Sequence, residues 1–312
     1  MNLDPQAKWV LDIAEQANAP LLENLSATEA KAAYEDRAQK LCFQDVPIGS
    51  VQDLDISGPH GPIPLRIYKP VSGSDILPVL VFYHGGGWVI GSRNSHDALC
   101  RKIAKQGGFL IVSVDYRMGP EARFPAGVDD AYASLLWTQQ TISEFGGDPE
   151  QIAVAGDSAG GNLSAVVCLL AKEQGTPMPV FQWLIYPATN MDMNTSSHKD
   201  FAEGYFLTNN LMTWFQGHYL RGSEDKDDWK ASPLLAKDCS SLPPALVQTA
   251  GYDPLKDEGK AYSDRLNEEG GRSAYTDYPG MIHGFINLGG AIDGAQDAID
   301  EGIKHLQKTF QS

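Results

Sequence analysis

The chain has 312 residues, enough for one large domain or two average ones. Its 24 basic and 40 acidic residues leave a formal net charge of -16, and this negative field repels nucleic acid and anionic membrane surfaces. Four widely spaced cysteines include no pair with the spacing of a metal or redox site, which favours a reduced, cytoplasmic protein without a metal. We therefore expect one main domain with insertions that has neither a nucleic-acid nor a membrane partner, and a homodimer is compatible with this composition.

The N-terminal segment bears on both location and structure. Met1 to Pro5 lacks the basic and apolar regions of a secretory signal, and no run in the chain approaches the roughly 20 apolar residues of a membrane helix. From Pro5 to about Lys40, apolar residues recur every three or four positions, and Ser26 to Glu29 has the form of a helix-capping box. This pattern predicts helices ahead of the first strand.

The central part of the chain alternates strand and helix patterns. Apolar and polar residues alternate at 51–56 and 65–68 around a Gly/Pro turn, which predicts an antiparallel hairpin at a sheet edge. The later alternation predicts an α/β fold, with a mainly parallel central sheet and helices on both faces. The predicted strands that follow are 79–83, 109–115, 151–157, 180–186, 245–252 and 273–278, and the predicted helices are 128–139, 163–172, 211–220 and 291–310.

The segment Gly156-Asp157-Ser158-Ala159-Gly160 lies between a predicted strand and a predicted helix. A serine on so tight a turn takes a strained backbone conformation, which requires small neighbours two residues away on either side. The pattern is the G-x-S-x-G nucleophile elbow, in which the serine hydroxyl stands above the sheet edge at the N-terminus of a helix. It makes Ser158 the candidate nucleophile.

A glycine-rich loop follows the strand 79–83. His84 is succeeded by three glycines, which free the backbone to direct N–H groups outward. In acyl-transfer enzymes such a loop, together with the amide after the nucleophile, forms an oxyanion hole. The predicted donors are the amides of Gly85, Gly86 and Ala159.

An acid and a histidine follow the last two predicted strands. Asp253 follows the strand 245–252, at the carboxyl end where open α/β sheets place their chemistry. His283 comes shortly after the short strand 273–278. The order Ser158, Asp253, His283 is that of α/β-hydrolases. We predict that His283 is the general base and that Asp253 orients it.

Four motifs together resemble the hormone-sensitive-lipase family of esterases, also called the bacterial family IV carboxylesterases. They are His84-Gly85-Gly86-Gly87, Gly156-Asp157-Ser158-Ala159-Gly160-Gly161, Asp253-Pro254-Leu255 and His283-Gly284-Phe285, and the stretch 116–126 is also similar to that family. The resemblance covers most of the chain after about residue 50. It implies an α/β-hydrolase fold with a helical cap and a cofactor-free carboxylesterase acting on small esters of short to medium chain length.

The same resemblance suggests a division of the chain. Residues 1–48 are the N-terminal part of a cap, 49–187 and 241–312 the two parts of the catalytic domain, and 188–240 a cap insertion, where the alternation of strands and helices fails. A helical pair simply packed on the sheet remains an alternative for the first segment. Candidate substrate-binding residues are a bulky side chain beside the glycine loop and several from the insertion. They are Trp88, Met191, Met193, Tyr205, Phe206 and Leu211, although aromatic stripes also fit a plain core.

Several other residues have structural interpretations. Asp157 is expected to complement a helix N-terminus, and Arg117 and Glu121 to form a structural ion pair. Cys168 lies in an apolar run typical of a core, and His96 has no partner motif. Two functional alternatives stay open: a binding protein of the same fold without turnover, and an amidase or peptidase using the same residues.

Overall fold

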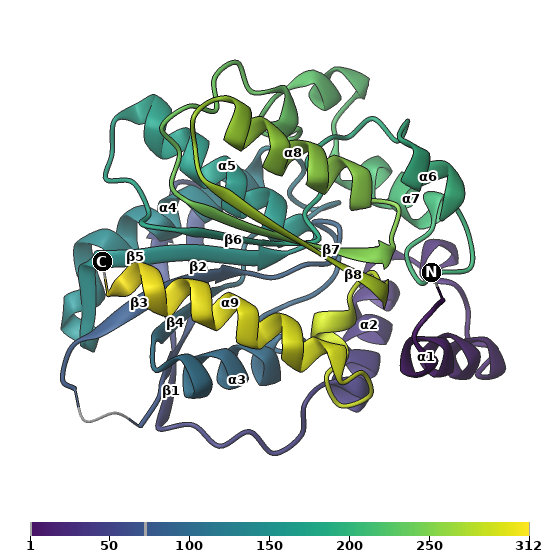
Figure 1. The fold of residues 1–312 in the computed structure, drawn as a ribbon, viewed down its shortest axis with the longest axis horizontal. Coiled ribbons are helices and arrows are strands. Elements are labelled where there is room, and N and C mark those ends of the chain that lie inside the picture. The colour runs from purple at the N-terminus through teal and green to yellow at the C-terminus, as the bar shows by residue number, and fades with distance from the viewer. Residues whose placement is uncertain (1, 72–73, 312) are drawn as a thin grey trace.

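The computed structural model describes residues 2–71 and 74–311. Within these residues a central eight-stranded sheet is covered by helices on both faces, so the predicted α/β architecture is confirmed (Figure 1). The strand order is β1-β2-β4-β3-β5-β6-β7-β8. The strands are β1 Ser50–Gly58, β2 Gly61–Lys69, β3 Leu77–Tyr83, β4 Leu110–Val114, β5 Gly147–Asp157, β6 Gln182–Ile185, β7 Ala245–Tyr252 and β8 Ser273–Ile282.

The first two strands form the predicted antiparallel hairpin, with β1 at the edge of the sheet. Strand β2 then pairs antiparallel with β4, and the remaining neighbours from β4 to β8 pair in parallel. The carboxyl ends of β5, β7 and β8 therefore meet at one edge of the sheet. This is the edge at which Ser158, Asp253 and His283 follow their strands.

The helices include three that the sequence pattern did not predict, α3, α6 and α8. Helix α3 begins at Asp97 without a side-chain cap, which removes the usual start signal. The α-helices are α1 Pro5–Gln16, α2 Ala27–Leu41, α3 Asp97–Gly107, α4 Ala126–Thr141, α5 Ala159–Gln174, α6 Ser196–Asp200, α7 Asn209–Tyr219, α8 Lys256–Glu268 and α9 Gly294–Phe310. The predicted helices correspond to α1, α2, α4, α5, α7 and α9.

Buried apolar side chains form two layers, one between each face of the sheet and the helices that cover it. Helices α4, α5 and α8 cover one face and α3 and α9 the other (Figure 1). Strand β3 alternates its side chains between the two layers, so its residues from Val79 to Tyr83 are all fully buried. A strand buried on both faces reads as a continuous apolar run, which is why the sequence identified it.

Helices α1 and α2 lie with α6 and α7 near the carboxyl edge of the sheet (Figure 1). The predicted capping box starts α2, because the Glu29 amide donates to Ser26 Oγ at 3.3 Å and the Ser26 amide donates to Glu29 Oε2 at 3.0 Å. The division into cap and catalytic parts stays an interpretation. Among the described helices, none has the length and apolar character needed to cross a membrane.

Candidate active site

Ser158 stands between the end of β5 and the start of α5, as the elbow pattern predicts. Its backbone has φ 55° and ψ -116°, an unfavourable region for a residue with a side chain. The Ser158 amide donates to the carbonyl of Ile185 at 2.8 Å, which ties the turn to β6. The strained turn is therefore held by the parallel sheet on which it is built.

Gly160 permits this turn because the chain passes very close to β3. A Cβ at position 160 would overlap the carbonyl oxygen of Tyr83, and that oxygen belongs to rigid backbone. Any side chain at this position must displace either the elbow or the strand.

Gly160→Ala is therefore expected to reduce the free energy of unfolding by about 3 kcal/mol or more, because an overpacked backbone contact cannot relax. Gly217→Ala is the matched control: Gly217 lies within α7, and a Cβ there would meet no atom within 4 Å. Helix propensity alone predicts a gain of up to about 1 kcal/mol for the control. Chemical denaturation measures both, and equal stabilities of the two variants would contradict the close approach.

Three side chains form a continuous hydrogen-bonded chain at the carboxyl edge. His283 Nε2 lies 2.9 Å from Ser158 Oγ, and His283 Nδ1 lies 2.7 Å from Asp253 Oδ2. With the proton on Nδ1, the imidazole donates to Asp253 and accepts from the Ser158 hydroxyl. The geometry is that of a nucleophile, a base and a group that orients the base.

Asp253, the acid of these three side chains, is held in place by the protein itself. Asp253 is fully buried, and its second carboxylate oxygen accepts the Leu255 amide at 2.8 Å. The ring of Tyr186 packs 4.7 Å from the His283 ring, between centroids. Packing and hydrogen bonds thus restrict the imidazole to the orientation that serves Ser158.

The glycine loop differs from its prediction at Gly85. The Gly85 amide donates to Asp157 Oδ1 at 2.8 Å, so it is already engaged and does not line the cavity. Gly86 and Gly87 do line the cavity, and Gly86 has φ 123°, a backbone region that favours glycine. Within the described part of the chain, the amides of Gly86, Gly87 and Ala159 have no hydrogen-bond acceptor.

Asp157 has the structural role expected from the sequence, but through different contacts. Besides Gly85, it faces His96, whose Nε2 lies 3.1 Å from Asp157 Oδ1; the sequence revealed no partner for His96. Burial raises the pKa of Asp157, but His96 and the Gly85 amide outweigh it and hold the pKa below its ordinary value. Burial also lowers the pKa of the neighbouring His84 to about 4, which keeps that ring neutral.

Arg117 is paired differently from the prediction. Its guanidinium donates to both carboxylate oxygens of Asp130 at 2.8 Å, whereas Glu121 is exposed. The carboxylate of a residue thirteen positions away on α4 is not apparent from sequence spacing alone. Cys168 is fully buried, as expected for a core residue.

A cavity of about 950 Å³ opens onto Ser158 and His283. Of the predicted lining residues Trp88, Phe206 and Leu211 contribute to it, as do Met191 and Met193. Trp88 is 4% exposed and stacks on Tyr219 with ring centroids 4.5 Å apart.

Tyr205 does not line the cavity, contrary to the prediction. Its ring packs against Phe201 and Tyr252, with centroid separations of 5.5 and 5.1 Å, while the neighbouring Phe206 faces the cavity. Consecutive residues in an irregular segment point in different directions, so the composition of the segment could not separate them.

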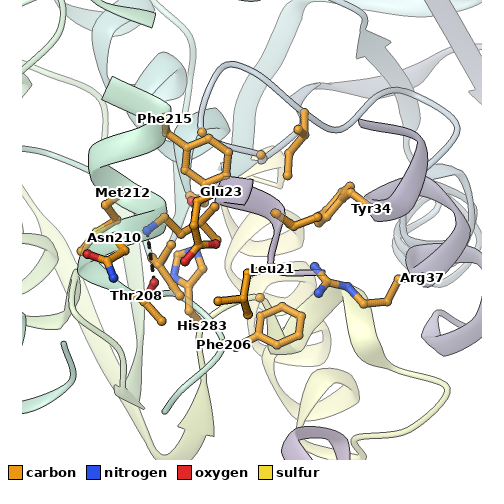
Figure 2. A pocket seen from close by; sticks show the side chains of 18 of the residues that line it. Leu21, Glu23, Tyr34, Arg37, Phe206, Thr208, Asn210, Met212, Phe215 and His283 are labelled. Carbon is orange, nitrogen blue, oxygen red and sulfur yellow. Dashed lines mark hydrogen bonds between the residues drawn. The ribbon is translucent and has the colours of Figure 1, made fainter. Parts of the chain in front are cut away.

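The cavity also contains residues that the sequence did not single out. Figure 2 shows Tyr34 and Arg37 extending from α2, and Met212 and Phe215 from α7, toward a common space near His283. The periodicity of the sequence predicted α2 and α7 as helices, but it did not predict which face of each helix lines the cavity. Both chain segments of the predicted cap therefore contribute to the cavity walls.

A buried acid, Glu258, contacts the cavity-lining residue His198. Glu258 Oε1 accepts the amides of Thr189 and Asn190 at 2.6 and 3.2 Å, and its Oε2 lies 3.4 Å from Nε2 of His198, which lines the cavity. The Nδ1 atom of His198 lies 2.6 Å from Thr195 Oγ1. Burial raises the pKa of Glu258 to about 8 and lowers the pKa of His198. A protonated Glu258 can donate to the neutral imidazole.

Glu258→Gln is expected to weaken the dependence of stability on pH. Burial, helped by the charges of Asp253 and Asp257, makes folded Glu258 keep its proton to about pH 8, while the ordinary carboxyl titrates near 4.5. Unfolding then releases a proton between these values, so the stabilisation is complete below pH 4.5 and declines as the pH rises to 8. The amide of the variant still reaches His198 but does not titrate.

Urea denaturation at pH 5 and pH 8 measures this effect. The loss of stability between the two values should be smaller in Glu258→Gln than in the parent chain. Glu268→Gln makes the same substitution at an exposed position on the same helix and should retain the parental slope. Parallel slopes for the parent and Glu258→Gln would show that Glu258 does not hold this proton.

Across residues 2–71 and 74–311, no group of three or more His, Cys, Asp or Glu side chains is arranged to hold a metal ion.

Comparison with known proteins places this geometry in a family. The sequence model of a protein family described as the α/β-hydrolase fold matches residues 80–287 of this chain. The carboxylic ester hydrolase LipN of Mycobacterium tuberculosis is 46% identical over 268 residues, covering 83% of this chain and 71% of LipN. The carboxylesterase NlhH of the same organism is 40% identical, covering 80% and 79% of the two chains.

Solved structures of ester hydrolases also superpose closely on this chain. An ester hydrolase from the metagenome of Lake Arreo, solved with a bipyridine phosphonate derivative, superposes with a TM-score of 0.96 at 39% identity, covering 99% of this chain and 100% of the other. An esterase of Pyrobaculum calidifontis gives 0.92 at 38% identity, covering 98% of each chain. The chain therefore belongs to the hormone-sensitive-lipase type of the α/β-hydrolases, and the family predicted from the four motifs is confirmed.

Proposed function

We propose that this chain is a serine carboxylesterase that hydrolyses short- to medium-chain esters through an acyl-enzyme on Ser158. The observation that carries the proposal is the hydrogen-bonded chain from Ser158 through His283 to Asp253, which opens onto the cavity. The ester hydrolases among its relatives support the same reaction class.

The proposed reaction begins with attack of Ser158 Oγ on the ester carbonyl carbon. His283 Nε2 takes the hydroxyl proton as the new C–O bond forms, and Asp253 stabilises the resulting imidazolium. The carbonyl oxygen becomes an oxyanion, which the free amides of Gly86, Gly87 and Ala159 are positioned to bind. Gly87 takes the role that the sequence suggested for Gly85, since the Gly85 amide is bonded to Asp157.

Collapse of this intermediate breaks the bond to the alcohol oxygen. His283 returns its proton to that oxygen, and the alcohol leaves Ser158 acylated. Water then attacks the acyl-enzyme with His283 again as base, and the carboxylic acid departs with the serine regenerated. Each oxyanion donor contributes roughly 3 to 4 kcal/mol to lowering the barrier.

Hydrolysis of 4-nitrophenyl butyrate tests this function against its alternatives. A binding protein without turnover would release no more nitrophenol than the buffer does. An amidase or peptidase would cleave the matched 4-nitroanilide of butyric acid at a comparable rate. Rapid ester cleavage with much slower anilide cleavage is the expected result, because the anilide is less reactive toward the same nucleophile.

The acyl-chain limit is expected to depend on Phe215. Its ring packs against Gly87, and its side chain lines the cavity, so it closes the space beside the proposed oxyanion site. In the parent chain, kcat/KM for 4-nitrophenyl esters should fall beyond about eight carbons, where further methylenes clash at about 1 to 3 kcal/mol. Phe215→Ala should move this limit to longer chains, with about fourfold gained for each methylene newly buried.

Tyr205→Leu is the matched control for the chain-length series. Tyr205 is also aromatic and adjacent to a lining residue, but it packs away from the cavity. Its profile should keep the parental limit. A parental rate that still rises at sixteen carbons would instead favour a lipase with an open acyl site.

The remaining expectations concern location and assembly. A reducing, cytoplasmic location is our proposal, and it is supported by the four cysteines, which are all free and buried. A homodimer stays a prediction.

A further inference from the structure

Arg37 brings an unpaired positive charge to the cavity. It belongs to α2 and is partly buried, and Figure 2 shows its guanidinium turned toward the cavity that contains Phe206 and His283. Among the described residues, no carboxylate oxygen lies within 4.0 Å of this guanidinium. Glu23 also lines the cavity, but it forms no ion pair with Arg37.

Other partly buried arginines in this protein are paired with acids. Arg66 contacts Asp53, as Arg265 contacts Glu269. The neighbour of Arg37 on the same helix, Asp36, pairs with Lys40 instead, at 2.7 Å. In a chain with 40 acidic and 24 basic residues, a partly buried guanidinium left without an acid is therefore unusual.

Aromatic rings surround the charge of Arg37. Its Cζ lies 4.3 Å from the ring centroid of Phe206 and 5.5 Å from that of Tyr34. These cation–π contacts hold the guanidinium but use few of its five N–H donors. Burial lowers the pKa of Arg37, and Tyr34 partly offsets this effect; an arginine nevertheless stays protonated in proteins.

The position of Phe206 relates Arg37 to the reacting bond. A Cβ on Gly284 would lie 3.5 Å from the Phe206 ring, and Gly284 directly follows His283. Arg37 is thus one aromatic ring away from the residue next to the proposed base. Since His283 must protonate the leaving oxygen, the alcohol part of an ester lies on the His283 side of the cavity.

We propose that Arg37 binds an anionic group, a carboxylate in the first instance, carried by the alcohol part of the substrate. The substrate class is then esters of hydroxy acids, in which a hydroxyl is acylated while a carboxylate remains free. A guanidinium makes two parallel hydrogen bonds to a carboxylate, and the apolar surroundings strengthen them. This inference rests on the proposed esterase function and specifies which esters it prefers.

Two acetate esters of nearly equal shape test the inference. 4-Acetoxybenzoate carries a carboxylate on its alcohol part, and 4-acetoxybenzamide carries a neutral amide in its place. The quantity to compare is the ratio of kcat/KM for the anion to kcat/KM for the amide. Because each variant is compared with the parent, the difference in leaving-group reactivity cancels.

Arg37→Met removes the charge while keeping an unbranched side chain, and it should lower this ratio by about tenfold or more. Arg37→Lys should retain part of the preference, since it keeps the charge but not the two parallel hydrogen bonds. Lys31→Met is the matched control: this lysine is on the same helix but does not line the cavity. Its ratio should change by less than about twofold.

The outcomes separate this inference from the general function. An unchanged ratio in Arg37→Met, with rates for both esters lowered equally, would mean that Arg37 only supports the fold and would overturn the inference. A charge preference found only in the acyl part, between 4-nitrophenyl hydrogen succinate and 4-nitrophenyl butyrate, would overturn the assignment to the alcohol side. Failure of the parent chain to hydrolyse any of these esters would instead contradict the esterase function.

Discussion

Ser158→Ala should lower kcat for 4-nitrophenyl butyrate by about 10⁴- to 10⁶-fold, because the proposed mechanism has only this hydroxyl within reach of both His283 and the free oxyanion donors. The Ser158 Oγ atom lies 2.9 Å from His283 Nε2, so the substitution removes the nucleophile and leaves the base without its partner. The fold should be preserved, since among the described residues the Ser158 hydroxyl forms a hydrogen bond only with His283.

A second serine provides the control for that result. Ser164 lies on α5, the helix that starts after the nucleophile, and its hydroxyl donates to the carbonyl of Gly160 at 2.9 Å. Ser164→Ala should keep kcat within about tenfold, with a loss of stability of about 1 kcal/mol. Circular dichroism and steady-state kinetics compare the two variants. Near-parental turnover by Ser158→Ala would exclude the serine mechanism.

His283→Ala should have a large effect by itself but almost none when Ser158 is already absent. Alone, it should lower kcat by about 10⁴-fold or more, because the hydroxyl loses its base. Added to Ser158→Ala, it should lower the residual rate by less than about tenfold, since the two residues act as one unit. Asp253, which holds His283 Nδ1 at 2.7 Å, should be non-additive in the same way.

The double-mutant cycle is measured with 4-nitrophenyl butyrate under saturating substrate. His305→Ala is the control histidine, since it lies on α9 and its ring stacks 6.1 Å from that of Phe181, away from the cavity. It should have the same small effect with and without Ser158. Additive losses for His283 and Ser158 would show that another residue accepts the serine proton.

The arrangement of the proposed nucleophile, base and acid was predictable because it depends on chain order and parallel strands. Ser158, Asp253 and His283 each follow a strand, and parallel strands bring their carboxyl ends to one edge. The glycines around Ser158 marked the elbow, because few other sequences tolerate its backbone conformation. A backbone requirement of this kind restricts neighbouring residues, so a short stretch of sequence reveals it.

Features that depend on contacts between distant segments were not predictable. The Gly85 amide was expected to bind the oxyanion, but the carboxylate of Asp157, 72 positions later, occupies it. Tyr205 and Phe206 looked equivalent in composition, yet only Phe206 faces the cavity. Arg37 had no sequence signal at all, since its significance comes from the lack of a carboxylate oxygen within 4.0 Å among the described residues.

Covalent labelling tests the central proposal most directly. Incubation with diethyl 4-nitrophenyl phosphate, followed by peptide mass spectrometry, should find one diethylphosphoryl group per chain, on the peptide that contains Ser158, with activity lost in proportion to labelling. A phosphoryl oxygen bound by the free amides of Gly86, Gly87 and Ala159 would resemble the proposed oxyanion. Complete inactivation with the label on another residue, or full activity after Ser158 is labelled, would contradict the acyl-enzyme mechanism.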